Sequence, residues 1–457
     1  MVWPQLRKQT QHKIAIFGLG YVGLVTAVCF AKKGYSVLGI DVDTQKLRQI
    51  RTLDTPFYEP RLVSYLREAV SKGSLQVTNE PAKSARSNLI FIAVGTPSKP
   101  DGSTDLAYVS NAVSMIGQTL RYVRPKNKPL VVIRSTVPPG TARNLVRLIL
   151  EKESKETVGK DIGLCSNPEF LQEGRAIHDA EHPDRIIIGS DDDTSIRKLE
   201  AFYREFHGGK LPPIIRTTYE NAELIKYANN AFLATKVSFI NCIASIAEKV
   251  PHADINIVAK AIGLDKRISP YFLSAGLGWG GSCFPKDLKA LIFLGRNLGC
   301  EPELIEAAVL RNERQRKKAV QFARRALGDL SGKKIALLGL AFKPNTDDIR
   351  EAVSISLVRD LLAEGAEVVV YDPAAMKKAR AVLRDTVTYA RDAMGCIDQA
   401  DCCIVVTEWR EFERIRPEVF LERMKRPVVI DCRRIFDPSE FSQTPIKFLA
   451  IGLGTVR

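Results

Sequence analysis

Residues 13–23 read KIAIFGLGYVG, and this stretch decides the fold. Its first five residues form an apolar run typical of a buried strand, and Gly18, Gly20 and Gly23 follow where a helix would begin. Asp41 ends the next apolar run. Three glycines alone would indicate only a tight turn. With a strand, a helix and an acid in register, they predict a dinucleotide site, in which the helix N-terminus attracts the pyrophosphate and Asp41 accepts from a ribose hydroxyl. A carboxylate there repels a 2′-phosphate, so we predict NAD as the cofactor.

Further apolar runs alternate with helical stretches through the first half of the chain. They lie at residues 36–40, 89–94, 130–133 and 185–188. This alternation predicts an α/β domain over residues 1–219, a doubly wound parallel sheet covered by helices. From about residue 220 to 250, apolar residues recur at helical spacing, which predicts one long helix within a helical domain over 220–327. Such a helix often pairs two subunits, although burial within one chain fits the same pattern.

The last part of the chain repeats the first. Residues 334–340 echo residues 13–19, and residues 367–372 echo residues 36–41. Residues 402–407 echo the strand that we expect to end at Val94. These echoes predict a second Rossmann-like domain over 328–457, with ligands near the carboxyl ends of its strands.

The second repeat departs from the first at its glycines. Residues 339–343 read GLAFK and keep one glycine of the three. We therefore expect this domain to bind a different phosphorylated ligand, since a lysine near a strand end can hold a phosphate. Candidate contacts, each of which alone also fits a surface charge, are Lys343, Arg350, Arg433 and Arg434.

The composition is that of an ordinary globular protein. Of 457 residues, 45% are hydrophobic and 26% charged, which excludes a disordered chain and a disulfide scaffold. The net charge of +15 raises the question of nucleic-acid binding. However, the basic residues are spread out, and the one cluster, residues 311–318, lacks interleaved aromatic residues and fits a solvated helix face. We expect no nucleic-acid partner.

Cysteines and histidines give no metal signature. The nine cysteines show no C-x-x-C pair and no metal-ligand spacing, and the five histidines form no cluster. We therefore predict a reduced, cytoplasmic protein without a metal. Residues 14–31 are uncharged, but glycines interrupt them at the turn from strand to helix, so we assign them to a folded core and expect no membrane association.

Residues 280–287, GGSCFPKD, prepare a cysteine for chemistry. Paired glycines let the backbone approach a ligand, and Pro285 suits the first turn of a helix. Cys283 then lies at a helix N-terminus, where the helix dipole and Lys286 favour the reactive thiolate. Asp287 follows four residues later on the same face. These features predict a nucleophile; a buried structural cysteine is the alternative.

In these motifs, the chain resembles the nucleotide-sugar 6-dehydrogenases of the UDP-glucose/GDP-mannose dehydrogenase family. The resemblance covers all but the extreme N-terminus. It implies two Rossmann-like domains joined by a central helical domain through which the chain forms a homodimer or a larger homo-oligomer. Its motifs are residues 18–23, 95–97, 135–138, 167–171, 283–287 and 342–348, and the helix around Lys226 and Asn230.

The resemblance implies a four-electron oxidation of the sugar C6 alcohol to an acid, with two NAD reduced and one water consumed. Cys283 would add to the intermediate aldehyde, giving a thiohemiacetal and then a thioester that water hydrolyses. Lys226 and Asn230, one helical turn apart, would stabilise the oxyanion; alone they also fit a surface lysine and a capping asparagine. The remaining catalytic candidates, which would move protons, activate water or position substrate, are Asp287, Thr136, Glu169 and Glu173, the last lying one turn from Glu169 if that segment is helical. The two glutamates alone also fit an exposed acidic pair.

The resemblance also assigns binding residues. It gives the cofactor site Gly18, Leu19, Gly20, Tyr21, Val22, Gly23, Asp41, Lys46, Gly95, Thr96, Pro97, Thr136, Glu173, Lys286 and Arg350. It gives the substrate site Glu169, Phe170, Leu171, Glu173, Lys226, Asn230, Arg267, Ser274, Gly276, Trp279, Gly280, Phe342, Lys343 and Arg433. Arg267 would reach the substrate of the neighbouring subunit. Trp279 stands where the family more often has Phe or Tyr, which leaves the closure of its loop open.

The expected substrate is UDP-glucose. Residues 183–189, PDRIIIG, following Glu173 and Gly174, resemble the enzymes that act on UDP-glucose more than their relatives. Neither spacing nor charge separates uracil from guanine, so GDP-mannose remains the nearest alternative and a UDP-N-acetylhexosamine another. A nucleotide-binding regulator without turnover is a third hypothesis, which must explain why Cys283, Lys226, Asn230 and Asp287 are all present.

Overall fold

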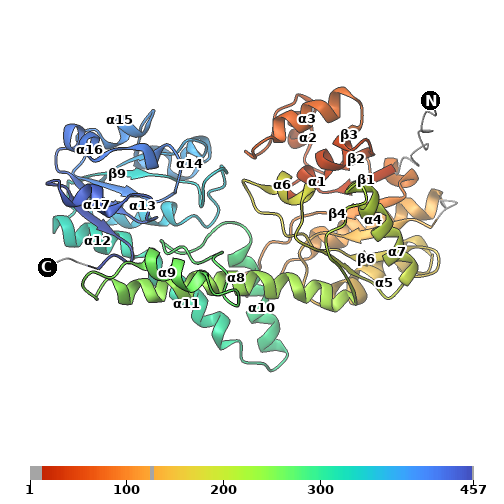
Figure 1. Ribbon diagram of the computed structural model, residues 1–457. Helices are drawn as coiled ribbons and strands as arrows, with labels where there is room; N and C mark the ends of the chain where they lie inside the picture. The colour runs from red at the N-terminus through yellow and green to blue at the C-terminus, as the bar shows by residue number, and fades with distance from the viewer. Residues whose placement is uncertain (1–12, 124–127, 455–457) are drawn as a thin grey trace, which may run out of the picture. The chain divides into compact units, whose positions relative to one another are not determined.

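The computed structural model describes residues 13–123 and 128–454. Its chain divides into two compact units, Met1–Ala228 and Asn229–Arg457. Figure 1 colours the first from red to yellow-green and the second from green to blue. The division falls inside the long helix α8, Tyr219–Ala247, which confirms the helix expected from about residue 220.

The first unit is built on an eight-stranded sheet in the order β3-β2-β1-β4-β5-β6-β7-β8. Neighbouring strands pair in parallel except β6 and β7, which are antiparallel. The chain therefore adds an antiparallel step to the predicted parallel sheet. The strands are β1 Lys13–Phe17, β2 Ser36–Ile40, β3 Leu75–Thr78, β4 Leu89–Ile92, β5 Leu130–Ile133, β6 Gly163–Ser166, β7 Ile186–Gly189 and β8 Ile214–Thr217.

Helices cover both faces of this sheet, because alternate strand residues feed two separate cores. Ile14 and Ile16 of β1 pack with the helices α1, α3, α6 and α7, whereas Ala15 and Phe17 pack with α4 and α5. This is the doubly wound arrangement that the alternating pattern predicts. The helical elements are α1 Tyr21–Lys32, α2 Thr44–Arg51, α3 Leu62–Ser71, η1 Pro81–Arg86, α4 Ala107–Val123, η2 Ala142–Val146, α5 Arg147–Ser154, α6 Ala176–Glu181 and α7 Asp193–Phe206.

The second unit repeats the plan of the first, as the sequence echo predicts. Its six strands lie in the order β11-β10-β9-β12-β13-β14, all paired in parallel, which matches the order of β1 to β6. The fold class is thus confirmed: two Rossmann-like sheets with a helical region between them in sequence. The strands are β9 Lys334–Leu338, β10 Glu367–Tyr371, β11 Thr388–Tyr389, β12 Cys402–Val405, β13 Val428–Asp431 and β14 Lys447–Ala450.

The helices of the second unit fall into two groups. Those between α8 and β9 form the central helical region, and the rest connect the strands of the second sheet (Figure 1). The first group is α9 Ile255–Gly263, α10 Phe284–Asn297, α11 Glu303–Arg316 and α12 Lys318–Leu327. The second is α13 Val353–Ala363, α14 Met376–Leu383, η3 Arg384–Thr386, α15 Ala393–Ile397, η4 Phe412–Arg414, α16 Pro417–Arg423 and α17 Pro438–Ser442.

The structure shows where the apolar residues 14–31 and the basic cluster 311–318 lie in the fold. Residues 14–31, which resemble a membrane span, form β1 and most of α1 in the core of the first unit. Among the described residues, α8 alone is long and apolar enough to cross a membrane, a test that core helices of soluble proteins also pass. The basic cluster at 311–318 is not a purely solvated face: Arg311 donates to the Asn241 carbonyl at 2.6 Å and Lys318 pairs with Glu248 at 2.5 Å, so both bind α8 or the turn after it.

Candidate functional site

The glycine fingerprint forms the turn between β1 and α1. Gly18 has φ +91°, and a Cβ there would lie 2.7 Å from the Ala93 carbonyl oxygen. A Cβ on Gly23 would lie 1.8 Å from the carbonyl oxygen of Gly18, so only glycine lets the helix approach the turn this closely. Gly20, the N-cap of α1, faces open space, with nothing within 4 Å of a built Cβ. That open space beside a helix N-terminus fits a pyrophosphate.

Asp41 lies at the end of β2 beside this turn. Its carboxylate accepts from the Leu19 amide at 2.7 Å, from the Asp43 amide at 2.9 Å and from the Lys46 ammonium at 2.9 Å. The first turn of α1 carries no acidic residue that would oppose an anion. The arrangement brings together the residues that the sequence assigned to NAD at this turn, and it fits that cofactor.

Hydrogen bonds join the two loops that follow the neighbouring strands β4 and β5 of the first unit. The Thr96 hydroxyl, in the loop after β4, donates to the Thr136 carbonyl at 2.9 Å. The Ser135 hydroxyl donates to the Val94 carbonyl at 2.7 Å. These bonds tie the loop of Gly95, Thr96 and Pro97 to the loop of Thr136. This fits the prediction that both loops contact the cofactor.

The predicted substrate segment follows β6. Glu169 and Lys226 are both buried and form an ion pair of 3.3 Å between Oε1 and Nζ. Two cations lie over the ring of Phe170, with Lys226 Nζ 5.2 Å and Arg185 Cζ 3.9 Å from its centroid. The segment from Glu169 to Glu173 is not helical, so Glu173 does not lie one helical turn beyond Glu169; it occupies the turn that leads into α6.

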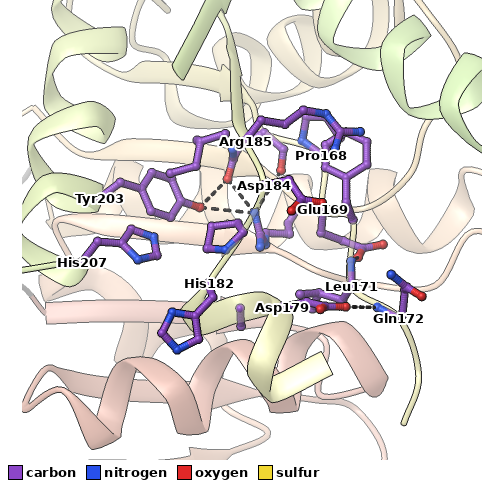
Figure 2. Close-up of a pocket in the computed structure, with 16 residues that line it drawn as sticks. Pro168, Glu169, Leu171, Gln172, Asp179, His182, Asp184, Arg185, Tyr203 and His207 are labelled. Carbon is purple, nitrogen blue, oxygen red and sulfur yellow. Dashed lines mark hydrogen bonds between the residues drawn. The ribbon is translucent and has the colours of Figure 1, made fainter. Parts of the chain in front are cut away.

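A small cavity of about 60 Å³ opens beside this segment at the carboxyl ends of β5 and β6. It is lined by Glu169, Phe170 and Leu171 of this segment, by Tyr203 of α7 and by His207, which follows α7. Figure 2 shows these side chains around the cavity. The Tyr203 hydroxyl donates to Asn167 Oδ1 at 2.5 Å, which fixes the residue that begins the substrate segment. The cavity therefore shares its wall with the candidate substrate residues.

Glu59, which no sequence motif indicates, links the glycine fingerprint to the predicted substrate segment. Its buried carboxylate accepts from the Tyr21 hydroxyl, from the Gly174 amide at 2.6 Å and from the Ala176 amide at 2.7 Å. Burial raises the pKa of Glu59, and burial with the neighbouring Glu59 raises that of Tyr21. Because Glu59 lies far in sequence from all three of these donors, no local motif could have identified it.

In the second unit, Cys283 is the N-cap of α10, and Pro285 lies in the first turn, as predicted. The Ser282 hydroxyl is 3.6 Å from the Cys283 sulfur. The Asp287 amide donates to the Cys283 carbonyl at 3.0 Å, which closes the first helical turn. Cys283 therefore has the helix-end position that favours a thiolate.

Asp287 is 1% exposed and has two strong partners. Asn230 Nδ2 donates to Oδ2 at 2.6 Å, and the Lys286 ammonium contacts Oδ1 at 2.5 Å. The lysine that the sequence placed beside the sulfur thus pairs with this carboxylate. The structure joins Asn230 to Asp287, and α8 carries Asn230 one turn after Lys226.

The loop before Cys283 packs tightly against two distant segments of the same unit. A Cβ on Gly276 would lie 3.0 Å from Arg433 Nη1, and a Cβ on Gly281 would lie 2.7 Å from the Phe342 ring. A Cβ on Gly280 would lie 2.3 Å from the Glu351 carbonyl oxygen. The loop that begins at Ser274 therefore meets the segments of Phe342 and Arg433, as the resemblance implies for a nucleotide site.

Three further candidates, Trp279, Arg350 and Arg267, differ in the partners that hold them. Trp279 is buried, and its Nε1 donates to the Ser238 hydroxyl at 3.0 Å, so the indole is held against α8. Arg350, which follows the segment of Lys343, pairs with Asp348 at 2.6 Å. Arg267 is 89% exposed and pairs only with the nearby Asp265, at 2.7 Å, among the ion pairs of the described residues. This exposure suits a side chain that reaches another molecule.

In the second Rossmann-like sheet, internal hydrogen bonds occupy the carboxylate that is equivalent to Asp41 of the NAD site. Asp372, which ends β10 as Asp41 ends β2, is 1% exposed. Its carboxylate accepts from the amides of Leu340, Ala341, Ala374 and Ala375 and from the Trp409 indole. Five internal donors leave no oxygen for a ribose, which agrees with the loss of glycines in this repeat. No group of three or more metal-ligating side chains occurs in the described part of the chain.

Comparison with known proteins gives the family. The models of the UDP-glucose/GDP-mannose dehydrogenase family match in chain order: the NAD binding domain at residues 12–207, the central domain at 220–314 and the UDP binding domain at 336–438. The first of these matches confirms NAD as the cofactor of the first domain.

Relatives match over nearly the full length. A UDP-glucose 6-dehydrogenase of Bacillus subtilis (strain 168), TuaD, is 42% identical over 446 residues, 97% of this chain and 94% of that protein. A UDP-glucose 6-dehydrogenase of Rhizobium meliloti (strain 1021) is 40% identical over 445 residues, 96% of this chain and 99% of that protein. A solved UDP-glucose dehydrogenase from the hyperthermophilic archaeon Pyrobaculum islandicum is 40% identical with a TM-score of 0.88, covering 98% of this chain and 100% of that one. The chain belongs to the UDP-glucose/GDP-mannose dehydrogenase family.

Proposed function

We propose that this chain is an NAD-dependent enzyme that oxidises UDP-glucose to UDP-glucuronate. The observation that carries the proposal is Cys283 at the N-terminus of α10, one turn from a buried Asp287 held by Asn230 and Lys286. A regulator without turnover would have no need of a buried carboxylate beside a helix-end cysteine. The UDP-glucose relatives from bacteria and an archaeon support the choice of substrate over GDP-mannose and the UDP-N-acetylhexosamines.

The reaction takes the C6 alcohol to an aldehyde and the aldehyde to an acid. NAD, when bound, accepts the hydride of each oxidation, so that two NAD are reduced and one water is consumed. Cys283 forms the covalent link: its sulfur adds to the aldehyde carbon, giving a thiohemiacetal whose oxidation leaves a thioester. Water then attacks the thioester carbon, the C–S bond breaks and the thiolate is released.

Two residues of α8 stabilise the oxygen that becomes negative at C6. Lys226 offers an ammonium and Asn230 an amide N–H, one helical turn apart. Glu169, paired with Lys226 at 3.3 Å, holds the ammonium in place in a buried setting. Asn230 is oriented in turn by the bond to Asp287.

Proton transfer and water activation fall to carboxylates and a hydroxyl. Asp287, fixed by two donors, accepts a proton from the attacking water or the alcohol. Thr136, tied by its carbonyl to Thr96, positions that water. Glu169 and Glu173, which flank the loop after β6, orient the sugar, and Glu173 also meets the cofactor.

The binding roles follow from the same assignments. The fingerprint from Gly18 to Gly23, with Asp41, Lys46 and the Gly95–Thr96–Pro97 loop, holds NAD, and Lys286 and Arg350 contact it. The nucleotide sugar meets Phe170, Leu171, Ser274, Gly276, Trp279, Gly280, Phe342, Lys343 and Arg433. The close packing of Gly276 on Arg433 and of Gly281 on Phe342 supports a nucleotide site in this part of the second unit.

We assign three domains, over residues 1–219, 220–327 and 328–457, which the order of the three matched family domains supports. The helical domain pairs two copies of the chain. Phe232, Phe239 and Ile246, spaced by seven residues along α8, are 66%, 52% and 57% exposed, an apolar stripe that a second helix would cover. Arg267 then reaches the partner's substrate. None of the nine cysteines, all of which lie in the described part of the chain, forms a disulfide, which supports a cytoplasmic location.

The experiment is a substrate panel. Purified protein is incubated with NAD and, separately, UDP-glucose, GDP-mannose and the UDP-N-acetylhexosamines, and NADH is followed at 340 nm. We expect UDP-glucose to give the highest kcat/KM. NADH from GDP-mannose alone would overturn the substrate assignment, and NAD binding without NADH from any sugar would favour the regulator.

A further inference from the structure

Glu223 is a buried acid of α8 that none of the assigned roles uses. It is 2% exposed and lies three residues before Lys226, on the adjacent turn. Both of its oxygens accept backbone hydrogen bonds: Oε2 from the Gly140 amide at 2.6 Å and Oε1 from the Ala142 amide at 2.8 Å. Glu223 therefore joins α8 to the start of η2, at the end of the loop that carries Thr136.

This loop is held firmly at its other end as well. The Thr136 carbonyl accepts from Thr96, and Ser135 donates to Val94, so the loop is fixed to the end of β4. Within it, the Thr141 hydroxyl donates to the Pro138 carbonyl at 2.6 Å. A short loop with two prolines and both ends bound transmits a change at Gly140 to Thr136, because it has few soft dihedral angles.

The choice of a carboxylate here is costly for stability alone. A carboxyl group buried at this position loses hydration, most of all when it ionises, and hydrogen bonds must compensate for the loss. The Glu223 carboxyl group offers one acceptor oxygen to each of the two amides, whereas glutamine provides one acceptor and one donor.

We propose that Glu223 is a positioning residue that sets the place of Thr136 relative to Lys226 during oxidation at C6. It acts through the two amides of Gly140 and Ala142, and it touches neither substrate nor cofactor. The inference rests on the roles proposed above for Thr136 and Lys226. It adds a link between α8 and the cofactor wall that runs through Thr96, Thr136, Gly140 and Glu223.

The test is a double-mutant cycle between Glu223 and Thr136. Glu223→Gln preserves the shape but loses one acceptor, and we expect kcat with UDP-glucose to fall about 10- to 100-fold, the order expected for a small misplacement of a reacting group. KM for UDP-glucose and for NAD should change less than about threefold, since uniform binding is retained. In a Thr136→Ala background, Glu223→Gln should have almost no further effect on kcat.

Glu220→Gln is the matched control. Glu220 lies one turn earlier on α8 and contacts the same η2 segment through Arg143 at 2.6 Å, but at a more exposed position. We expect this variant to keep the wild-type kcat. Glu223→Asp, whose shorter side chain cannot reach both amides, is the second variant should the glutamine protein not fold, and it should show the same kcat loss and the same non-additivity.

Two results would overturn the inference. One is an unchanged kcat in Glu223→Gln; the other is an equal loss in the wild-type and Thr136→Ala backgrounds, which would place the effect of Glu223 elsewhere. Failure of the proposed function is a separate result, because it appears as absence of NADH from UDP-glucose in the wild-type protein.

Discussion

The Asn230 amide donates a hydrogen bond to the Asp287 carboxylate, with 2.6 Å between Nδ2 and Oδ2. The bond joins α8 to the first turn of α10, whose N-cap is Cys283. Lys286 contacts the other oxygen of Asp287 at 2.5 Å, so the carboxylate is compensated on both sides and has one orientation. A side chain so fixed is suited to take a proton at a defined atom.

Removal of Asn230 should therefore affect both the oxyanion and the base. We expect Asn230→Ala to lower kcat for NADH formation about 10²- to 10³-fold, the cost of one oxyanion donor, with a smaller change in KM. Asn221→Ala, an exposed position on the same helix, is the control. A kcat within a factor of two of wild type for Asn230→Ala would remove Asn230 from the mechanism.

The fingerprint offers a matched pair of glycines. A Cβ on Gly23 would lie 1.8 Å from a backbone oxygen, whereas a Cβ on Gly20 would meet nothing within 4 Å. We expect Gly23→Ala to destabilise the fold without cofactor by about 1–3 kcal/mol, as overpacking does. Gly20→Ala should melt like wild type but raise the Kd for NAD at least about tenfold, because the new methyl occupies the pyrophosphate space. Thermal melts and titration calorimetry check both, and unchanged NAD binding by Gly20→Ala would contradict the proposed cradle.

The sequence predicted most of the fold because its main strands carry strong local signals. The β1 turn has a glycine pattern, and β9 repeats the apolar run of β1. In contrast, β6 is only four residues long and includes Gly163 and Ser166, and β11 has two residues, so neither shows a period. The antiparallel entry of β7 depends on pairing with β6, which no local pattern encodes.

The site was predictable where its residues lie in one motif. Cys283 and Asp287 are four residues apart, and a single helix start places both. Glu59 and Glu223 were missed because their partners, Gly174 and Gly140, are distant in sequence and are backbone groups, which leave no trace in side-chain patterns. The pairing of Lys286 with Asp287 likewise required the side-chain positions.

The titration of Glu223 should also make the free energy of unfolding depend on pH. Burial raises the pKa of its carboxyl from 4.5 to about 8, although the amides of Ala142 and Gly140 act in the opposite direction. The folded chain then keeps a proton that the unfolded chain has lost, so the stability contributed by this group is present below pH 4.5 and is lost as the pH rises through about 8. Because glutamine does not titrate, the thermal midpoint of Glu223→Gln relative to wild type should rise between about pH 4.5 and pH 8 and level off at higher pH. A difference independent of pH would contradict the assignment.

Arg267 gives a test of the paired subunits. If it acts on the partner's substrate, Arg267→Ala and Cys283→Ala homodimers should each be nearly inactive. A mixed dimer has one site with neither defect, so mixing and reassociation should restore activity. Recovery is measured as NADH formation after exchange, and Phe239→Glu in both chains, which places a charge in the apolar stripe, should abolish it. No recovery despite demonstrated subunit exchange would show that Arg267 acts within its own chain.

The central claim is that one chain performs both oxidations of UDP-glucose through Cys283. It is tested most directly by the moles of NADH formed per mole of UDP-glucose consumed, with the product identified by mass spectrometry, for the wild type and for Cys283→Ala. We expect two NADH and one UDP-glucuronate from the wild type and no UDP-glucuronate from the variant. A wild-type ratio of one with release of the aldehyde, or normal UDP-glucuronate production by Cys283→Ala, would contradict the account.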